Sequence, residues 1–246
     1  FGYDSTDGTC PNDNLYRIIG VFDGEVKLIK YDYAKSTLLG TDGNYSNTYS
    51  SLMFSTASYK GNNSLSEIGI YYWNVLNQNE WSTSRLNTTN LNTNYLRNIG
   101  TKWSNKIATH TWKVGGNTTS NIYSVTASNT YTNEITTPAE NTTYEAKVGL
   151  MYVSDYGYAA SSSSWSTTLN NYNNVRANNW MYIGLFQWTI ARRSDNSNTA
   201  FYVIDGGSVD NDRVDNSYAV RPVLYLASET VYAGGFGTAS SPILIN

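Results

Sequence analysis

Residues 188–226 read WTIARRSDNSNTAFYVIDGGSVDNDRVDNSYAVRPVLYL, and the rest of the chain is organised around this stretch. Its two ends are apolar and regular. We interpret Phe201–Ile204 as one strand and Tyr218–Leu226 as another, with Asp205–Gly207 as the turn signal after the first. Charged and hydrogen-bonding side chains crowd the loop at 208–217. Rigid strands beside so varied a polar surface favour recognition over catalysis, although an ordinary solvated hairpin has the same pattern.

Composition narrows the class of protein. The chain has 246 residues, which fits one large domain, and we predict a single domain over 1–246. Hydrophobic residues make up 40% and aromatic residues 14%, enough for a core, while charged residues make up only 14%. Asn, Ser, Thr and Tyr carry the polar surface instead, and the net charge is -3. This balance is typical neither of a nucleic-acid-binding protein nor of a disordered one, and it suits adaptable binding surfaces.

The scarcity of Cys and His excludes several kinds of site. Cys10 and His110 are the sole representatives of their types, too few for the usual zinc or non-haem iron ligand sets. We therefore expect no metal, no cofactor and no disulfide within the chain. His110 is interpreted as structural, with contact to a ligand as the alternative. No apolar run is long enough to span a membrane, so we expect no membrane contact and any anchor to lie outside these residues.

The amino-terminal part predicts a hairpin. Leu15–Phe22 and Glu25–Lys30 flank Asp23-Gly24, a dipeptide that suits the positive φ angles of a tight turn. In the second strand Val26 and Leu28 alternate with Lys27, which predicts one buried face and one wet face. Residues 36–66 are rich in Ser, Thr, Asn and Gly, and we expect loops there with short strands at most.

Helical spacing dominates the middle of the chain. Ser82 and Ser84 are candidate N-caps for helices that continue to residue 107, and Gly100 divides them. Further on, Lys147–Val153 predicts a buried strand, and Ser154-Asp155 predicts the cap of a short helix. The stripe of aliphatic and aromatic residues in the helices indicates core packing. A closing strand is expected at 242–245.

Four segments carry a resemblance to a known group of proteins. They read YRIIGVFDGEVKLI, SNKIATHTWKVGG, KVGLMYVSDYGYA and YAVRPVLYL. Together they resemble uncharacterised surface proteins of gut Firmicutes that have the C-type lectin fold in its formylglycine-generating-enzyme-like form. The resemblance implies an α+β domain with the first hairpin beside the last strand, helices packed on the sheet, and termini close together. It also implies an extracellular or cell-surface location, of bacterial or phage origin.

The same fold is found in the variable proteins of diversity-generating retroelements, whose carboxyl-terminal segment is hypermutated mainly at Asn codons. Such codons cannot become Lys, Glu, Gln, Met or Trp, and none of these five occurs between Arg192 and Ser217. The resemblance implies scaffold positions at Trp188, Ala200, Phe201, Val203, Gly207, Val209, Val214 and Tyr218. It implies ligand-binding positions between them, namely Arg193, Asn196, Asn198, Tyr202, Ile204, Asp205, Ser208, Asp210, Asn211, Asp212, Arg213, Asp215 and Asn216. In relatives a Cys precedes the start, so Cys10 is expected to have a partner outside the chain.

The known chemistries of this fold need residues that this chain lacks. It has one Cys where formylglycine-generating enzymes use a pair for copper, and it lacks the Glu-Pro-Asn and Gln-Pro-Asp tripeptides of calcium-dependent lectins. We therefore favour a non-enzymatic domain that binds an unknown protein or glycan, with no catalytic residue, and we expect Tyr202 and Arg213 to be affinity anchors. The alternatives are a structural pilin or adhesin subunit, and a glycan-active enzyme using Glu80 or Asp155. A calcium site at Asp210, Asp212 and Asp215 is a further alternative, although Val214 breaks the EF-hand spacing.

Overall fold

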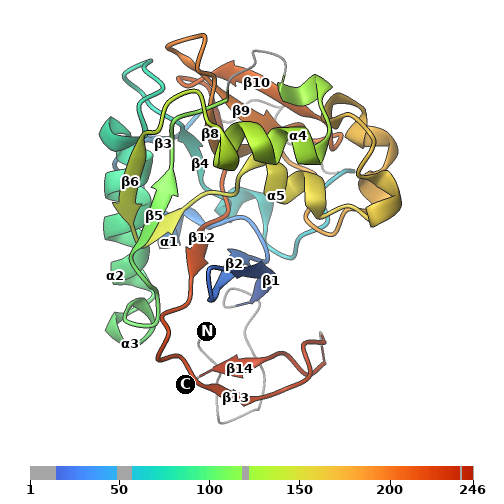
Figure 1. The fold of residues 1–246 in the computed structure, drawn as a ribbon. Helices are drawn as coiled ribbons and strands as arrows, with labels where there is room; N and C mark the ends of the chain where they lie inside the picture. Colours follow the sequence, from blue (N-terminus) through green and yellow to red (C-terminus); the bar gives the residue numbers. More distant parts are fainter. Residues whose placement is uncertain (1–14, 49–56, 118–121, 239, 246) are drawn as a thin grey trace.

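The computed structural model describes residues 15–48, 57–117, 122–238 and 240–245, which form a mixed α+β fold built on two main sheets (Figure 1). The larger sheet has the order β10-β9-β8-β11-β4-β3. Its strands in that order are Val209–Arg213, Thr199–Val203, Gln187–Arg192, Ser217–Ala219, Ile70–Tyr72 and Tyr45–Ser46. The smaller sheet has the order β1-β2-β12-β7, with strands Tyr16–Phe22, Glu25–Lys30, Val223–Tyr225 and Val148–Gly149.

Two further hairpins and a set of short helices complete the fold. One hairpin pairs β5 (His110–Lys113) with β6 (Thr143–Ala146), and the other pairs β13 (Tyr232–Gly234) with β14 (Leu244–Ile245). The α-helices are α1 (Ser36–Leu39), α2 (Leu96–Asn98), α3 (Thr101–Ser104), α4 (Ala127–Tyr131) and α5 (Val153–Tyr158). The 3-10 turns are η2 (Leu65–Glu67), η3 (Trp81–Thr83), η5 (Ile122–Ser124), η7 (Ser162–Ser164), η8 (Leu169–Asn174) and η9 (Arg176–Asn178). Two segments have π-helical geometry, η4 (Leu86–Tyr95) and η6 (Thr132–Thr136).

The first hairpin forms as predicted, but Lys27 lies in the core. Strands β1 and β2 pair antiparallel around a turn in which Asp23 and Gly24 have φ angles of 52° and 85°. Lys27 is only 2% exposed, against the expectation of a wet face. Strand β2 lies between β1 and β12, and the chain covers both of its faces. The Nζ of Lys27 lies 2.6 Å from Oδ2 of Asp155, so a carboxylate compensates the buried charge.

The stretch 218–226, predicted as one strand, is two strands in different sheets. Strand β11 pairs with β4 and β8, and β12 pairs with β2 and β7. The chain crosses between the sheets at Arg221 and Pro222, where proline has no N–H for a ladder. Arg221 is 1% exposed, donates to Oε1 of Gln187 at 3.1 Å, and burial lowers the pKa of its guanidinium to about 10. A fixed arginine thus links the two sheets at the crossing.

The middle of the chain forms helices that differ in detail from the prediction. Gly100 separates α2 from α3 with a φ of 82°, as expected. The predicted N-caps are wrong: Ser82 lies inside η3, and the hydroxyl of Ser84 donates to the carbonyl of Trp73 at 2.5 Å. Helix α5 forms, but Asp155 caps it from its third position by accepting the N–H of Tyr152 at 2.8 Å.

Other predicted elements are shorter than expected. The strand expected at 147–153 has ladder bonds only at β7, because the chain turns into α5 directly afterwards. The closing strand is reduced to β14, and residues 36–66 contain α1 and β3. Cys10 and the amino terminus lie outside the described residues. The expected closeness of the two ends therefore concerns a part of the chain that the structure does not describe.

One large buried cluster connects the elements. It includes Trp73, Trp81, Trp112 and Trp188, each at most 1% exposed, and it draws on both sheets and the helices around them. His110 packs at its edge, with its ring 3.6 Å from that of Tyr225, centroid to centroid. In the described parts of the chain, no helix is both long and apolar enough to cross a bilayer.

Candidate ligand-binding surface

The predicted binding stretch forms the β9–β10 end of the larger sheet. Strand β10 is the last strand of the order found among the described residues, and it pairs antiparallel with β9. The register sets Asp210 opposite Tyr202, and Asn211 opposite Phe201. All of β9 is buried, whereas in β10 only Val209 is buried, the next three residues are half-buried and Arg213 is exposed. The hairpin therefore combines a strand within the core with an accessible edge strand.

Burial divides the predicted scaffold positions from the predicted ligand positions. The eight scaffold positions are all buried. The ligand positions are half-buried or exposed, with one exception: Tyr202 is 8% exposed, against the expectation that it projects outward. Because both faces of β9 are covered, alternation along the strand does not bring Tyr202 to the surface. Tyr202 therefore does not fit the role of an exposed anchor.

Tyr202 belongs to an aromatic cluster beneath the acidic side chains of β10. Its ring stacks on that of Tyr218 with centroids 4.7 Å apart and planes 28° apart. Trp188 lies 4.5 Å and Phe186 5.4 Å from Tyr218 by the same measure. The hydroxyl of Tyr218 donates to Oδ2 of Asp212. Burial and the bond to Asp212 raise the pKa of Tyr218, so this phenol stays protonated and holds the carboxylate in place.

Asn79 holds the loop between β8 and β9 from below, a role that the sequence did not reveal. This side chain is 1% exposed, and its Nδ2 lies within hydrogen-bond distance of three loop carbonyls. The distances are 2.8 Å to Arg193 O, 2.5 Å to Asn196 O and 2.8 Å to Thr199 O. Asn79 is more than a hundred residues away in sequence, and it follows no pattern that marks it as a clamp. The backbone of the loop is fixed while its side chains face outward.

The two accessible arginines are held by neighbouring carboxylates. Arg193 binds Asp195 with both Nε and Nη2, at 3.0 and 2.9 Å, and its Nη1 reaches Asn211 at 3.1 Å. Arg213 binds Asp215 in the same two-pronged way, at 2.9 and 2.6 Å. The Arg213 side chain is 58% exposed. Each guanidinium is thus oriented in advance, and it can offer its remaining N–H groups to a partner.

Side chains from α5, η9 and the segment after η9 hold the turn between β9 and β10. Three donors reach its carbonyls: Tyr182 to Asp205 at 2.5 Å, Arg176 to Gly206 at 3.3 Å, and Tyr156 to Gly207 at 2.6 Å. Gly207 has a φ of 97°, and a Cβ there would lie 2.9 Å from Cβ of Arg176. A glycine is therefore needed at this turn.

The remaining candidates lie around this turn, in the loop before β9 and in the loop after β10. Ile204, Asp205 and Ser208 at the turn are half-buried, as are Asn198 before β9 and Asn216 after β10. The Ser208 hydroxyl donates to Asn170 O at 2.8 Å, so this side chain also fastens the turn to η8.

The three aspartates considered as calcium ligands have other partners. Asp210 accepts the N–H of Asn211 at 2.8 Å, Asp212 accepts the Tyr218 hydroxyl, and Asp215 pairs with Arg213. Within the residues that the structure describes, no three His, Cys, Asp or Glu side chains gather as metal ligands would. The geometry therefore does not favour the calcium alternative.

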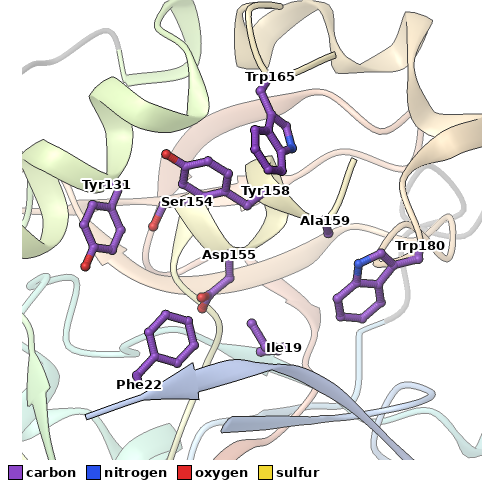
Figure 2. A pocket seen from close by; sticks show the side chains of 9 residues that line it. All are labelled: Ile19, Phe22, Tyr131, Ser154, Asp155, Tyr158, Ala159, Trp165 and Trp180. Atoms are coloured by element: carbon purple, nitrogen blue, oxygen red, sulfur yellow. The ribbon is translucent and has the colours of Figure 1, made fainter. Parts of the chain in front are cut away.

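A pocket of about 420 Å³ lies outside this surface, between β1 and α5 (Figure 2). Its lining consists of Ile19, Phe22, Tyr131, Ser154, Asp155, Tyr158, Ala159, Trp165 and Trp180. Sequence reasoning missed this pocket because five separated places in the chain supply its walls, and no local spacing links them. It did name Asp155 as a candidate acid for an enzyme. Glu80, the other candidate, lies 4.0 Å from Arg192 and is not among the lining residues.

Next to the pocket, Glu134 is buried behind the start of α5. Its carboxylate accepts the N–H groups of Val153 and Ser154, both at 3.0 Å. Burial raises the pKa of Glu134 to about 7, and these hydrogen bonds oppose the rise only in part. Since Glu134 does not line the pocket, its role is to support α5.

Comparison with known proteins gave no relative: no protein-family model, no curated protein and no solved structure matches this chain.

Proposed function

We propose that this chain is a non-enzymatic recognition domain that binds a protein or glycan ligand through residues 193–216. The observation that carries the proposal is the division of burial in the β9–β10 hairpin. Buried side chains fix the backbone, and the accessible positions carry Asp, Asn, Ser and Arg side chains. A surface of this kind can change its side chains without changing its fold.

The loops of this surface are ordered before any ligand binds. Asn79 fixes the loop between β8 and β9, and Tyr156, Tyr182 and Arg176 fix the turn between β9 and β10. Ordering loops and side chains on binding costs free energy, so a surface that is already ordered retains more of its contact energy as affinity. This supports recognition by a preformed site.

The finer assignment follows the resemblance of the sequence. We propose a C-type lectin-like fold of the formylglycine-generating-enzyme-like type, acting as the variable protein of a diversity-generating retroelement or as a surface adhesin. The resemblance implies the first hairpin beside the last strand. The pairing of β2 with β12, which lies in the stretch 218–226, supports it, although the later strands β13 and β14 form a separate two-stranded sheet. The proposed location is outside the cell or on its surface.

The alternatives make different demands on the same residues. In a structural pilin or adhesin subunit, the accessible polar side chains at 193–216 would be ordinary surface with no ligand. A glycan-active enzyme would use Asp155, but a glycosidase of the common kind needs a second carboxylate across the bond to be cut. Asp155 is the one acid among the residues that line the pocket. Binding is therefore the better supported activity.

Two randomised libraries test the proposal. One randomises Asp210, Asn211 and Arg213, and the matched library randomises the scaffold positions Val203, Val209 and Val214. Most members of the first library should display as folded protein, and most members of the second should not. Equal tolerance in the two libraries would show that burial does not separate scaffold from surface.

A binding screen tests the function itself. The wild type is screened against arrays of cell-surface glycans and secreted proteins, next to the variant Asp210→Ala/Arg213→Ala. Loss of an anchor pair should weaken binding at least tenfold, about 1.4 kcal/mol, with the melting temperature unchanged. Equal binding by both proteins would move the site elsewhere. A reverse-transcriptase gene beside a near-copy of the codons for 192–223 would independently support diversification.

A further inference from the structure

The aromatic pocket is a concave site that is distinct from the hairpin surface. It draws on β1, the end of α4, α5 and the segments at 159–165 and 180, and none of the candidates at 193–216 lines it. Figure 2 shows Asp155 among the rings of Phe22, Tyr131, Tyr158 and Trp180. Its volume of about 420 Å³ falls within the range of small-molecule sites, roughly 300–1,000 Å³.

Three aromatic side chains are exposed at this pocket. Tyr131 and Tyr158 are each 36% exposed, and Trp165 is 41% exposed. Their rings meet nearly edge to face, with planes 87° apart for Tyr158 and Trp165 and 72° apart for Tyr131 and Tyr158. They do not stack flat against one another, so ring surface stays open at the mouth of the pocket. Clustered exposed apolar surface of this kind marks binding sites.

The pocket also contains polar groups that make no hydrogen bond within the part of the chain that the structure describes. The hydroxyls of Tyr131 and Tyr158 and the Nε1 of Trp180 have no hydrogen-bond partner among the described residues. The buried tyrosines nearby behave differently: Tyr156 and Tyr172 each donate to a glycine carbonyl, at 2.6 and 2.9 Å. The pocket therefore offers apolar faces together with free donors and acceptors.

The charges around the pocket disfavour a cation. The carboxylate of Asp155 is paired with Lys27 at 2.6 Å, so the floor carries no net negative charge. Arg17 lies against Trp180, with its Cζ 5.7 Å from the ring centroid and its Nη1 donating to the Trp180 carbonyl at 3.2 Å. An aromatic cage for a quaternary ammonium group needs an electron-rich site without such competing cations.

From these observations we infer that the pocket binds a neutral pyranose sugar ring. The apolar C–H face of such a ring lies against the electron-rich face of an aromatic side chain. Its hydroxyls match the free groups of Tyr131, Tyr158 and Trp180, and Oδ1 of Asp155 accepts no hydrogen bond from the described residues. The sugar is bound and not cleaved, because a single acid lines the pocket. This inference does not depend on the hairpin surface.

The test is titration of the whole chain with neutral methyl glycosides of glucose, galactose, mannose and N-acetylglucosamine, followed by calorimetry and ligand-observed NMR. Choline chloride is the cationic comparison. At least one glycoside should bind saturably, and choline should not. Failure of all four glycosides to bind, tighter binding of choline, or hydrolysis of a p-nitrophenyl glycoside of the bound sugar would overturn the inference. Immobilised oligosaccharides ending in the same sugar then distinguish a glycan end from a free monosaccharide.

Variants place the binding in the pocket. Trp165→Ala removes an exposed ring, and Tyr158→Phe removes only a free hydroxyl, so both should keep the fold. Each should weaken glycoside binding at least tenfold. Trp103→Ala on α3 is the control for loss of a tryptophan outside the pocket, and it should bind as the wild type does. Full binding by Trp165→Ala and Tyr158→Phe would overturn the inference. The hairpin variant Asp210→Ala/Arg213→Ala should leave glycoside binding intact, which separates this result from the proposed function.

Discussion

Strands β9 and β10 are bonded to each other residue by residue, yet they differ in almost every physical respect. All five residues of β9 are buried, whereas Val209 is the one buried residue of β10. The difference arises from position in the sheet, because β9 has a neighbour on each side and β10 has only β9 among the described residues. Sharing a ladder therefore does not make two strands equally important for stability. Substitutions made in one strand and then in the other test whether β9 is scaffold and β10 is surface, as the proposed function requires.

The largest expected effect is at a single cross-strand pair. Phe201 and Asn211 face each other in the register, with Phe201 fully buried and Asn211 partly accessible. Phe201→Ala should reduce the free energy of unfolding by about 3–5 kcal/mol. Asn211→Ala loses a bond to Arg193 and should cost less than about 1 kcal/mol. Urea titrations followed by circular dichroism measure both values. Similar losses for the two variants would mean that β10 is as structural as β9.

A buried acidic residue, Glu134 of η6, extends the comparison to the start of α5, which it contacts. Its pKa lies at about 7 in the folded protein, against an ordinary value of 4.5. Between these two pH values the folded chain holds a proton that the unfolded chain has lost, so Glu134 makes stability fall as pH rises from 4.5 to 7. The total change is up to about 3 kcal/mol. Unfolding free energies measured across this range should show the fall.

Glu134→Gln is the matched variant for this pH dependence. It cannot ionise, so its stability should lack the contribution of Glu134, whatever its absolute stability. Burial lowers the pKa of His110, so this residue makes stability rise with pH, opposite to the effect of Glu134. The informative quantity is therefore the difference in stability between wild type and Glu134→Gln at each pH. Identical profiles for wild type and Glu134→Gln would contradict the raised pKa.

A smaller effect is expected where the buried aromatic cluster contacts β10. Tyr218→Phe keeps the aromatic cluster but removes the hydroxyl that donates to Asp212. The loss should be about 1.5–3 kcal/mol, the usual net value of a hydrogen bond to a charged group. Asp212→Asn keeps an acceptor for this hydroxyl and should be closer to wild type. A change of several kcal/mol in Tyr218→Phe would mean that the edge strand supports the cluster.

The sequence predicts the positive-φ turn and helix break well, and it predicts long-range contacts poorly. The first hairpin follows from Asp23-Gly24, whose turn geometry is local, and Gly100 separates two helices for the same reason. Lys27 was misjudged because its partner Asp155 lies 128 residues away. Tyr202 was misjudged because alternation along a strand cannot reveal that both of its faces are covered. In these cases tertiary contacts decide burial.

The candidate sites show the same limit. The burial of the scaffold positions in 188–218 could be expected, since the resemblance identified them in a continuous stretch. The role of Asn79 could not be predicted, because its three acceptors lie more than a hundred residues further along the chain. The aromatic pocket could not be predicted either, because its walls meet only when β1, α4 and α5 have packed. Continuous surfaces can be predicted from sequence, and assembled cavities require the fold.

The smallest expected effect is the most informative for function. The variant Asp210→Ser/Asn211→Ser/Arg213→Ser changes three β10 residues and spares both Tyr202 and Asp212, which contact the aromatic cluster. Accessible substitutions usually change stability by only about ±0.5 kcal/mol each. The bidentate pair of Arg213 with Asp215 is exposed, and such pairs contribute little. The melting temperature should therefore shift by a few degrees at most, as differential scanning calorimetry would show. If the variant instead loses several kcal/mol, β10 belongs to the scaffold, and its polar side chains are then explained by stability with no ligand required.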